Sequence, residues 1–230
     1  MSIVHLYSIV GILYLTHYNN YMLKTNSISH TYTGGSTFRF PDIFCKKKDT
    51  LLVLGKSGAG KTTLLHILAG ILSPIEGEVV LDGTVLYEMS RKNLDRYRGQ
   101  NIGLVFQKPH FVQSISAEEN LLLSQKMAGQ KQDKARVKSI LEKLNIYHRK
   151  DAKNYNMSQG EQQRLSIARA LINDPKVILA DEPTSALDDH NCQSVVQLLQ
   201  EQSIEVGAAL VIVTHDNRLK NVFHNCIEIK

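Results

Sequence analysis

The chain has 230 residues, 43% hydrophobic and 21% charged, a globular composition that excludes a disordered, collagen-like or disulfide-scaffolded chain. Its 27 basic and 22 acidic residues give a formal charge of +5, which by itself does not indicate nucleic-acid binding. Three scattered cysteines predict no disulfide framework and fit a reducing cytoplasm: Cys45, Cys192 and Cys226.

The first 21 residues, Met1 to Tyr21, contain no charged side chain. Their longest apolar run, Ile9 to Leu15, is too short for a membrane-spanning helix, which needs roughly 20 apolar residues. A secretory signal would carry a basic start and a small-residue cleavage site, whereas the first lysine here is Lys24. Two interpretations stay open: residues 1–21 are an N-terminal extension of the native protein, or Met22 is its natural start.

From Leu23 onward, short runs rich in apolar and β-branched residues alternate with stretches of helical pattern. The predicted strands are Phe38–Phe44, Thr50–Leu54, Glu78–Leu81, Ile102–Phe106, Val177–Ala180, Leu210–Thr214 and Cys226–Ile229. The predicted helices are Lys61–Ala69, Ala117–Met127, Asp133–Leu144, Ser158–Ile172 and Asp189–Gln202. Several strands are continuous apolar runs, as expected of parallel strands covered on both faces, so the pattern predicts an α/β fold with a mostly parallel sheet.

The segment from about Lys108 to Asn156 carries no strand pattern and is predicted to form two or three helices. Between Lys126 and Lys153 it holds nine basic residues against three acidic ones, an excess larger than the net charge of the whole chain. A solvated helical face is the simplest interpretation. Contact with anionic lipid or with a protein partner is the alternative that this charge leaves open.

Residues Gly55 to Thr62 fit the pattern G-x-x-x-x-G-K-[ST] and lie between a predicted strand and a predicted helix, as a phosphate-binding loop requires. The glycines let backbone N–H groups turn toward phosphate oxygens, and the helix adds the partial positive charge of its N-terminus. Lys61 would place a full charge on the β- and γ-phosphates, and the Thr62 hydroxyl would ligate Mg²⁺. The predicted nucleotide-binding residues are Gly55, Lys56, Ser57, Gly58, Ala59, Gly60, Lys61, Thr62 and Thr63.

Another predicted strand, Val177–Ala180, ends in two carboxylates, Asp181 and Glu182. Asp181 at the strand tip is predicted to hold Mg²⁺ through water. Glu182 projects one residue farther and is the predicted catalytic base, which would polarise a water molecule toward the γ-phosphate. A carboxylate in that role typically contributes roughly 10²–10⁴-fold in rate.

The remaining motifs of the chain resemble those of ATP-binding cassette (ABC) ATPases. They are Tyr32 (resembling the adenine-stacking aromatic), Phe106-Gln107 (the Q-loop), Met157–Arg164 (the signature motif), Ser185–Asp188 (the D-loop) and Thr214–Asp216 (the histidine switch). All stand in the order of that family and span residues 32–216 together with the phosphate loop and the acidic strand end. On these motifs the chain resembles an ABC nucleotide-binding domain.

The resemblance implies a P-loop NTPase fold with a mostly parallel core sheet, a small antiparallel β part and an inserted α-helical subdomain. The domain would span residues 22–230, with the helical subdomain at about 108–156. The resemblance also implies ATP and Mg²⁺ as cofactors and ATP hydrolysis, coupled to transport, as the reaction.

Two such domains meet head to tail in this family, so Ser158 and Gly160 would contact the γ-phosphate of ATP bound to the second subunit, at a helix N-terminus. Gln107 would sense both Mg²⁺ and the attacking water, and His215 would touch the γ-phosphate. Tyr32 would stack on adenine, and Asp188 would lie across the dimer contact.

The signature motif departs from the family's usual Leu-Ser-Gly-Gly-Gln or Leu-Ser-Gly-Gly-Glu at two positions. Met157 replaces leucine, which is a mild apolar exchange. Gln159 puts a side chain where glycine is usual. Since Ser158, Gly160 and Glu161 remain, the signature role is retained.

Single cassettes of this length usually serve a transporter, so the implied partners are a transmembrane permease subunit on a separate chain and a second ATP-binding subunit, in a homodimer. A groove near the Q-loop would receive a short helix of the permease, and the expected location is cytoplasmic, peripheral on the inner face of the cell membrane. Ile178–Thr184 and Ser116–Leu121 look most like the compact cassettes of lipoprotein-release and macrolide-export systems.

Two alternatives stay open. One is a cassette that drives a membrane partner mechanically without moving a solute, as in cell-division complexes. The other is a soluble ABC ATPase that acts on nucleic acid or ribosomes, although no nucleic acid is expected because relatives of that class usually carry two cassettes or long coiled-coil inserts.

Overall fold

The computed structural model describes residues 21–184 and 189–229. The motif Ser185–Asp188 and residues 1–20 of the N-terminal segment lie outside the described residues.

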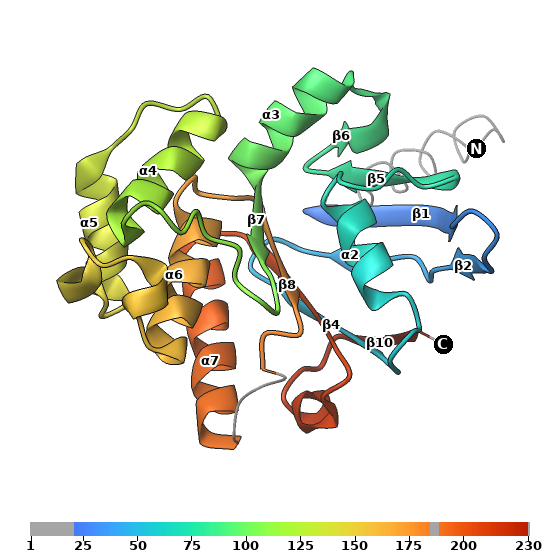
Figure 1. Cartoon of the computed structure of the whole chain (residues 1–230). Helices are drawn as coiled ribbons and strands as arrows, with labels where there is room; N and C mark the ends of the chain where they lie inside the picture. Colours follow the sequence, from blue (N-terminus) through green and yellow to red (C-terminus); the bar gives the residue numbers. More distant parts are fainter. Residues whose placement is uncertain (1–20, 185–188, 230) are drawn as a thin grey trace, which may run out of the picture.

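A parallel sheet of five strands forms the centre of the molecule (Figure 1). Its strand order is β10 (Cys226–Ile229), β4 (Thr50–Gly55), β9 (Ala209–Thr214), β8 (Val177–Asp181) and β7 (Ile102–Val105). All four neighbouring pairs run parallel, and β8 and β9 are buried along their whole length. The predicted α/β fold with a mostly parallel sheet is therefore confirmed.

Helices cover both faces of this sheet. Along β4, Leu51 and Val53 join the apolar cluster beneath helix α2 (Lys61–Leu68), whereas Leu52 and Leu54 join the cluster on the other face. That other face is covered by α6 (Gln159–Leu171) and α7 (Asp189–Val206), which lie across the sheet from α2 in Figure 1. The alternation of side chains along a strand thus divides the core into two halves.

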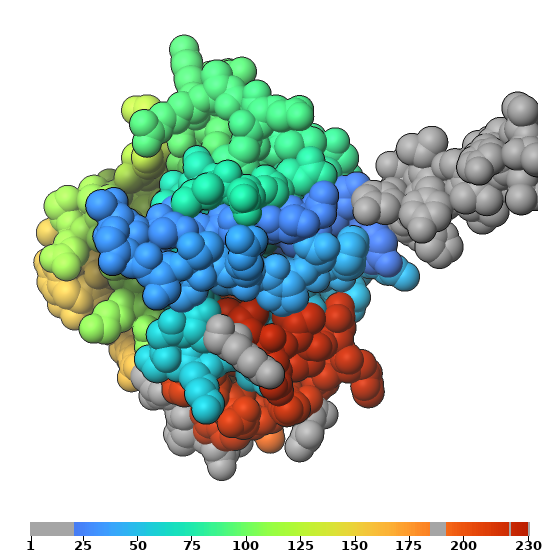
Figure 2. Space-filling view, turned by 90° about the vertical axis from the view of Figure 1, so that its right-hand side faces the viewer, coloured from blue at the N-terminus to red at the C-terminus, as the bar shows by residue number. Residues whose placement is uncertain are grey.

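A second, antiparallel sheet packs over α2. It consists of β1 (Leu23–Thr31), β2 (Thr37–Arg39), β3 (Phe44–Cys45), β5 (Glu76–Leu81) and β6 (Thr84–Val85). Figure 2 shows its N-terminal strands, in blue, running across one face of the molecule between the green and the red segments.

The strand predictions for this sheet omitted β1 and the short β6, and one of them, Phe38–Phe44, was wrong. The central strand β1 was not predicted at all. The single predicted strand Phe38–Phe44 is divided into β2 and β3, which both pair with β1. Pro41 lies between them and has no N–H to donate to a continuous ladder.

The helix predictions agree with the structure to within a few residues. Helix α4 spans Ala117–Met127 as predicted, and α5 spans Lys134–Lys143. Helix α3 (Arg91–Asn101) was not predicted as a helix, and only Leu94 on it is buried. In the described parts of the chain, four short 3₁₀ turns complete the order: η1 (Leu86–Glu88), η2 (Tyr147–Arg149), η3 (Asn154–Asn156) and η4 (Asn217–Asn221). Within the described ranges, no helix has the length and apolar character that crossing a membrane requires.

The basic stretch between Lys126 and Lys153 is largely paired with carboxylates. Its ion pairs are Arg136–Asp174, Lys138–Glu142, Lys143–Glu205, Arg149–Glu161 and Lys150–Asp151. The pairs lie at the surface, where such contacts add little stability. Their arrangement agrees with the simpler interpretation of a solvated face.

Candidate functional site

The phosphate-loop motif connects β4 to α2. Gly58 and Gly60 have φ angles of 83° and 86°, in the left-handed region that glycine adopts without strain. Gly60 is also the residue before the first turn of α2, and a Cβ there would lie 2.7 Å from Cδ1 of Phe38. Both the turn and the close approach of the aromatic ring therefore require glycine at position 60.

The Lys61 side chain is buried at the start of α2, with only 8% of its surface exposed. Its Nζ donates hydrogen bonds to the carbonyl oxygens of Gly55 (2.9 Å) and Lys56 (3.1 Å). It also lies 3.4 Å from Oε1 of Glu182. The loop thus holds an ammonium group within its own curve, where it can meet a phosphate oxygen.

Asp181, the last residue of β8, faces the same turn of α2. The Thr62 hydroxyl donates to Oδ2 of Asp181 at 3.2 Å, while Oδ1 is buried without a hydrogen-bond partner among the described residues. Burial, followed by the nearby charge of Glu182, raises the pKa of Asp181 above its ordinary value. Oxygen donors of this kind suit a hard divalent cation, and the unpartnered Oδ1 leaves a coordination position open.

Glu182 follows directly, in a left-handed backbone conformation with φ 46° that is rare for a non-glycine residue. Its Oε2 accepts a hydrogen bond from the Thr214 hydroxyl (2.7 Å), and its Oε1 lies 2.8 Å from Nδ1 of His215. Burial raises the pKa of Glu182, but the hydrogen bonds from His215 and Thr214 outweigh it and lower the pKa below its usual range. The carboxylate is therefore ionised at neutral pH.

Tyr32 directly follows the end of β1 and lies beside the start of α2. Its hydroxyl is 3.1 Å from the Thr63 hydroxyl on α2, and its ring contacts His30 edge-on with centroids 4.8 Å apart. The side chain remains 46% exposed. An aromatic ring exposed to this extent can stack on a flat base.

A cavity of about 860 Å³ opens beside the loop. Residues 55–59 of the loop line it together with His215, Asn217, Glu228 and Ile229. The loop residues Lys56, Ser57, Gly58 and Ala59 therefore face open space next to the buried Lys61.

Five predicted site residues come together in one contact network at the carboxyl edge of the sheet: Lys61, Thr62, Asp181, Glu182 and His215. Gln107 is exposed two residues after β7 ends. Because Val105 pairs with Ala180, the chain leaves the sheet there beside the end of β8.

Ser158 and Gly160 are not brought to this network. Ser158 is the N-cap of α6, where its hydroxyl accepts from the N–H of Glu161 and its own N–H donates to the Glu161 carboxylate. Gly160 is exposed, with open space around its Cα. Of the two departures in this motif, Met157 is buried in the core and Gln159 is exposed. The motif thus faces outward, on a helix that covers the opposite side of the sheet from α2.

Sequence reasoning overlooked three polar groups around Glu182. Thr184 and Thr214 are fully buried, and Asp216 is joined to both by hydrogen bonds. Thr214 and Asp216 lie in the Thr-His-Asp motif, but the sequence analysis assigned a function only to the histidine of that motif. The signal available was a threonine at the end of an otherwise apolar strand.

A family model described as ABC transporter matches residues 42–185, more than half of the chain. The chain belongs to this family. It is an ABC ATPase.

Curated relatives of the chain are named lipoprotein-releasing system ATP-binding protein LolD. The protein from Bacteroides thetaiotaomicron is 38% identical over 203 residues, which cover 87% of this chain and 93% of the relative. The protein from Bacteroides fragilis is 35% identical, with coverage of 90% and 97%.

Solved structures of cassettes share the fold. The structure of cbiO1 from Clostridium perfringens, part of the ABC transporter complex cbiONQ, superposes with a TM-score of 0.81 at 29% identity, covering 92% of this chain and 85% of that one. A dimeric, post-hydrolysis state of the ATP-binding cassette MJ0796 bound to ADP and Pi has a TM-score of 0.80 at 30% identity, with coverage of 91% and 94%.

Proposed function

We propose that this ABC ATPase is the ATP-hydrolysing subunit of a lipoprotein-releasing type of transporter and drives a separate membrane subunit. The observation that carries the proposal is the contact network at the carboxyl edge of the sheet. It joins Lys61, Thr62, Asp181, Glu182 and His215. The names of the relatives support the transporter class.

In this proposal the backbone of residues 55–63 binds the phosphates and Lys61 neutralises their charge. Mg²⁺ would be held by Thr62 and Asp181, with Gln107 nearby, and would supply charge compensation for the β- and γ-phosphates. Glu182 accepts the proton of the attacking water, because its lowered pKa keeps it ionised. His215 contacts the γ-phosphate and Tyr32 stacks on adenine.

We further propose that two copies assemble head to tail, so that Ser158 and Gly160 of one copy contact the nucleotide held by the other. Support comes from the single chain, in which α6, with its outward-facing start, and α2, which follows the phosphate loop, cover opposite faces of the sheet. A dimeric cassette with ADP and Pi among the structural neighbours supports the same assembly.

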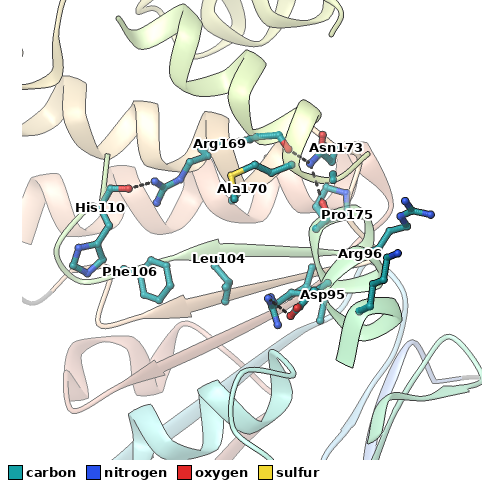
Figure 3. Close-up of a pocket in the computed structure, with 16 residues that line it drawn as sticks. Asp95, Arg96, Leu104, Phe106, His110, Arg169, Ala170, Asn173 and Pro175 are labelled. Carbon is teal, nitrogen blue, oxygen red and sulfur yellow. Dashed lines mark hydrogen bonds and ion pairs between the residues drawn. The ribbon is translucent and has the colours of Figure 1, made fainter. Parts of the chain in front are cut away.

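The site for the membrane subunit in this proposal is a groove of about 600 Å³ between α3, β7, α4 and α6 (Figure 3). Leu104 and Phe106 supply apolar surface, and Arg96 and Arg169 approach it from opposite ends in Figure 3. The groove also contains Asp95, but that carboxylate is paired with Arg98 at 2.7 Å. An amphipathic helix with acidic side chains fits this surface, and binding it would hold the ATPase at the inner face of the membrane.

The experiment that tests the proposal is the Glu182→Gln substitution. Because the amide cannot accept the proton, we expect ATP binding to persist while hydrolysis falls by roughly 10²–10⁴-fold. Dimers should accumulate in ATP during size-exclusion chromatography. Normal turnover by this variant would contradict the role of Glu182.

The membrane partner is tested by capture of the tagged Glu182→Gln protein from detergent-solubilised membranes with ATP. A stoichiometric protein with several membrane spans is expected to be captured. The control is the Lys143→Ala variant, which changes a surface ion pair outside the groove and should capture the same protein. Recovery only with ribosomes or DNA would contradict the transporter function and leave the ATPase intact.

A further inference from the structure

A closed ring of hydrogen bonds joins the loop after β8 to the loop after β9. The Thr214 hydroxyl donates to Oε2 of Glu182 (2.7 Å) and accepts from the N–H of Asp216 (3.0 Å). The Asp216 carboxylate in turn accepts from the Thr184 hydroxyl at 3.1 Å. Thr184 follows Glu182 by two residues, so Pro183 completes the ring through the backbone.

The ring is buried and firmly held. Thr184 and Thr214 have no exposed surface. Arg218 fixes the Asp216 carboxylate with hydrogen bonds to both oxygens, from Nε to Oδ1 at 2.8 Å and from Nη2 to Oδ2 at 2.6 Å. Cys192, in the first turns of α7, also points its Sγ toward Oδ2 at 3.8 Å.

This arrangement can stabilise both the backbone and the side chain of Glu182. Its φ of 46° is an unfavourable backbone conformation that persists only when the surroundings enforce it. Its side chain must also keep one carboxylate orientation in order to act as a base. His215 is 58% exposed and can reorient, whereas the Thr214 hydroxyl is rigidly placed at the end of β9.

We propose that Thr214, Asp216 and Thr184 are positioning residues for ATP hydrolysis. The ring holds the carboxylate of Glu182 and its backbone in the orientation in which it accepts the proton of the attacking water. This inference rests on the proposed role of Glu182 as the base. It assigns to Asp216 and the two threonines an effect on the rate of hydrolysis and none on nucleotide binding.

The test compares Thr214→Val with Thr214→Ser. Valine has nearly the shape of threonine but lacks the hydroxyl, whereas serine keeps the hydroxyl and lacks the methyl group. Because hydrogen bonds to charged groups are among the stronger ones, we expect Thr214→Val to lower kcat by about 10- to 100-fold with KM for ATP unchanged. Thr214→Ser should retain a kcat close to that of the unchanged protein.

Thr25→Val is a matched control. Thr25 is also buried, and its hydroxyl accepts a hydrogen bond from the N–H of Ile43 in the antiparallel sheet, away from the ring. Its replacement should lower thermal stability and leave kcat and KM unchanged. A similar loss of kcat in Thr25→Val would show that removing any buried hydroxyl slows hydrolysis, and it would overturn the specific role of the ring.

Equal kcat values for the valine and serine variants would overturn the inference. Should Thr214→Val fail to fold, Thr184→Val and Thr184→Ser test the opposite side of the ring, with the same expectation and the same contrary outcome. Glu182→Gln distinguishes a failure of the ring from a failure of the proposed base. If that variant is inactive while Thr214→Val and Thr184→Val are fully active, only the ring is refuted; if Glu182→Gln hydrolyses ATP normally, the proposed base fails as well.

Discussion

Asp181 combines two properties that a stable core residue avoids. Its Oδ1 is buried without a partner among the described residues, and burial raises the pKa of the carboxyl group. An acid whose pKa is higher in the folded than in the unfolded state makes folding less favourable at neutral pH, where it must ionise. The carboxylate therefore weakens the nucleotide-free protein, in keeping with a functional role.

We predict that Asp181→Asn is more stable than the unchanged protein in the absence of nucleotide. The amide keeps an acceptor for the Thr62 hydroxyl and removes the buried charge. A gain on the order of 1 kcal/mol corresponds to a melting temperature about 2–4 °C higher for a chain of this size. Thermal unfolding with and without MgATP measures the effect, and MgATP should stabilise the variant far less than the unchanged protein.

Asp82→Asn is the control for that prediction. Asp82 is about half exposed and pairs with Lys176 at the surface, so its neutralisation should leave the melting temperature nearly unchanged. A lower melting temperature for Asp181→Asn would show that the carboxylate stabilises the fold by itself.

The start of α6 is built on the same pattern as the start of α4. Ser158 and Glu161 form a capping box at α6, and Ser116 and Glu119 form one at α4. Each serine satisfies an N–H group of the first turn that has no partner within the helix. The two serines thus have the same structural task, but only Ser158 is proposed to contact nucleotide.

We predict that Ser158→Ala and Ser116→Ala lower stability by a similar amount, about 1 kcal/mol, because each removes one N-cap. ATP hydrolysis at saturating protein concentration should fall only in Ser158→Ala. Chemical denaturation and steady-state ATPase measurements separate the two effects. Equal ATPase activity in both variants would contradict a role for Ser158 beyond capping.

Strand β1 shows why part of the fold could not be predicted from the sequence. Its sequence is mostly polar, and three of its buried residues are Thr25, Ser29 and His30. Each is satisfied by a side-chain hydrogen bond to a distant segment, to Ile43, Glu76 and Ser73 respectively. An apolar pattern cannot reveal such a strand, because its burial depends on partners that only the folded chain supplies. The central strands were predictable because their apolar runs are buried on both faces.

The candidate site likewise contains parts that the sequence predicts and parts that depend on the folded chain. The phosphate loop and the Asp181-Glu182 pair are local motifs, so the sequence alone predicted them and the structure brings them into contact. The ring from Glu182 to Thr214 joins residues 32 apart in the chain. It depends on the register of β8 against β9, in which Asp181 pairs with Val213. Only the assembled sheet provides that register.

At the scale of the molecule, the two parts of the proposed composite site stand at the starts of helices that cover opposite faces of the core sheet, Lys61 at α2 and Ser158 at α6. A head-to-tail dimer contains two such sites, each using Lys61 of one copy and Ser158 of the other. A dimer of one Lys61→Ala chain and one Ser158→Arg chain would carry both defects in one site and neither in the other. Two inactive variants should therefore complement each other.

We predict that an equal mixture of Lys61→Ala and Ser158→Arg recovers about one quarter of the unchanged ATPase activity. Half of the dimers are mixed by random pairing, and each has one intact site of two. The measurement is ATPase activity of the mixture against each variant alone. A mixture as inactive as its components would indicate that Ser158 acts on nucleotide in its own chain.

The position of Tyr32 has an optical consequence. The chain contains no tryptophan, and the Tyr32 ring lies beside α2 with part of its surface exposed. A Tyr32→Trp variant would therefore carry a single indole fluorophore beside the start of α2. Since stacking on a purine quenches indole emission, its intensity would follow the arrival and departure of ATP during turnover, without any chemical label on protein or nucleotide.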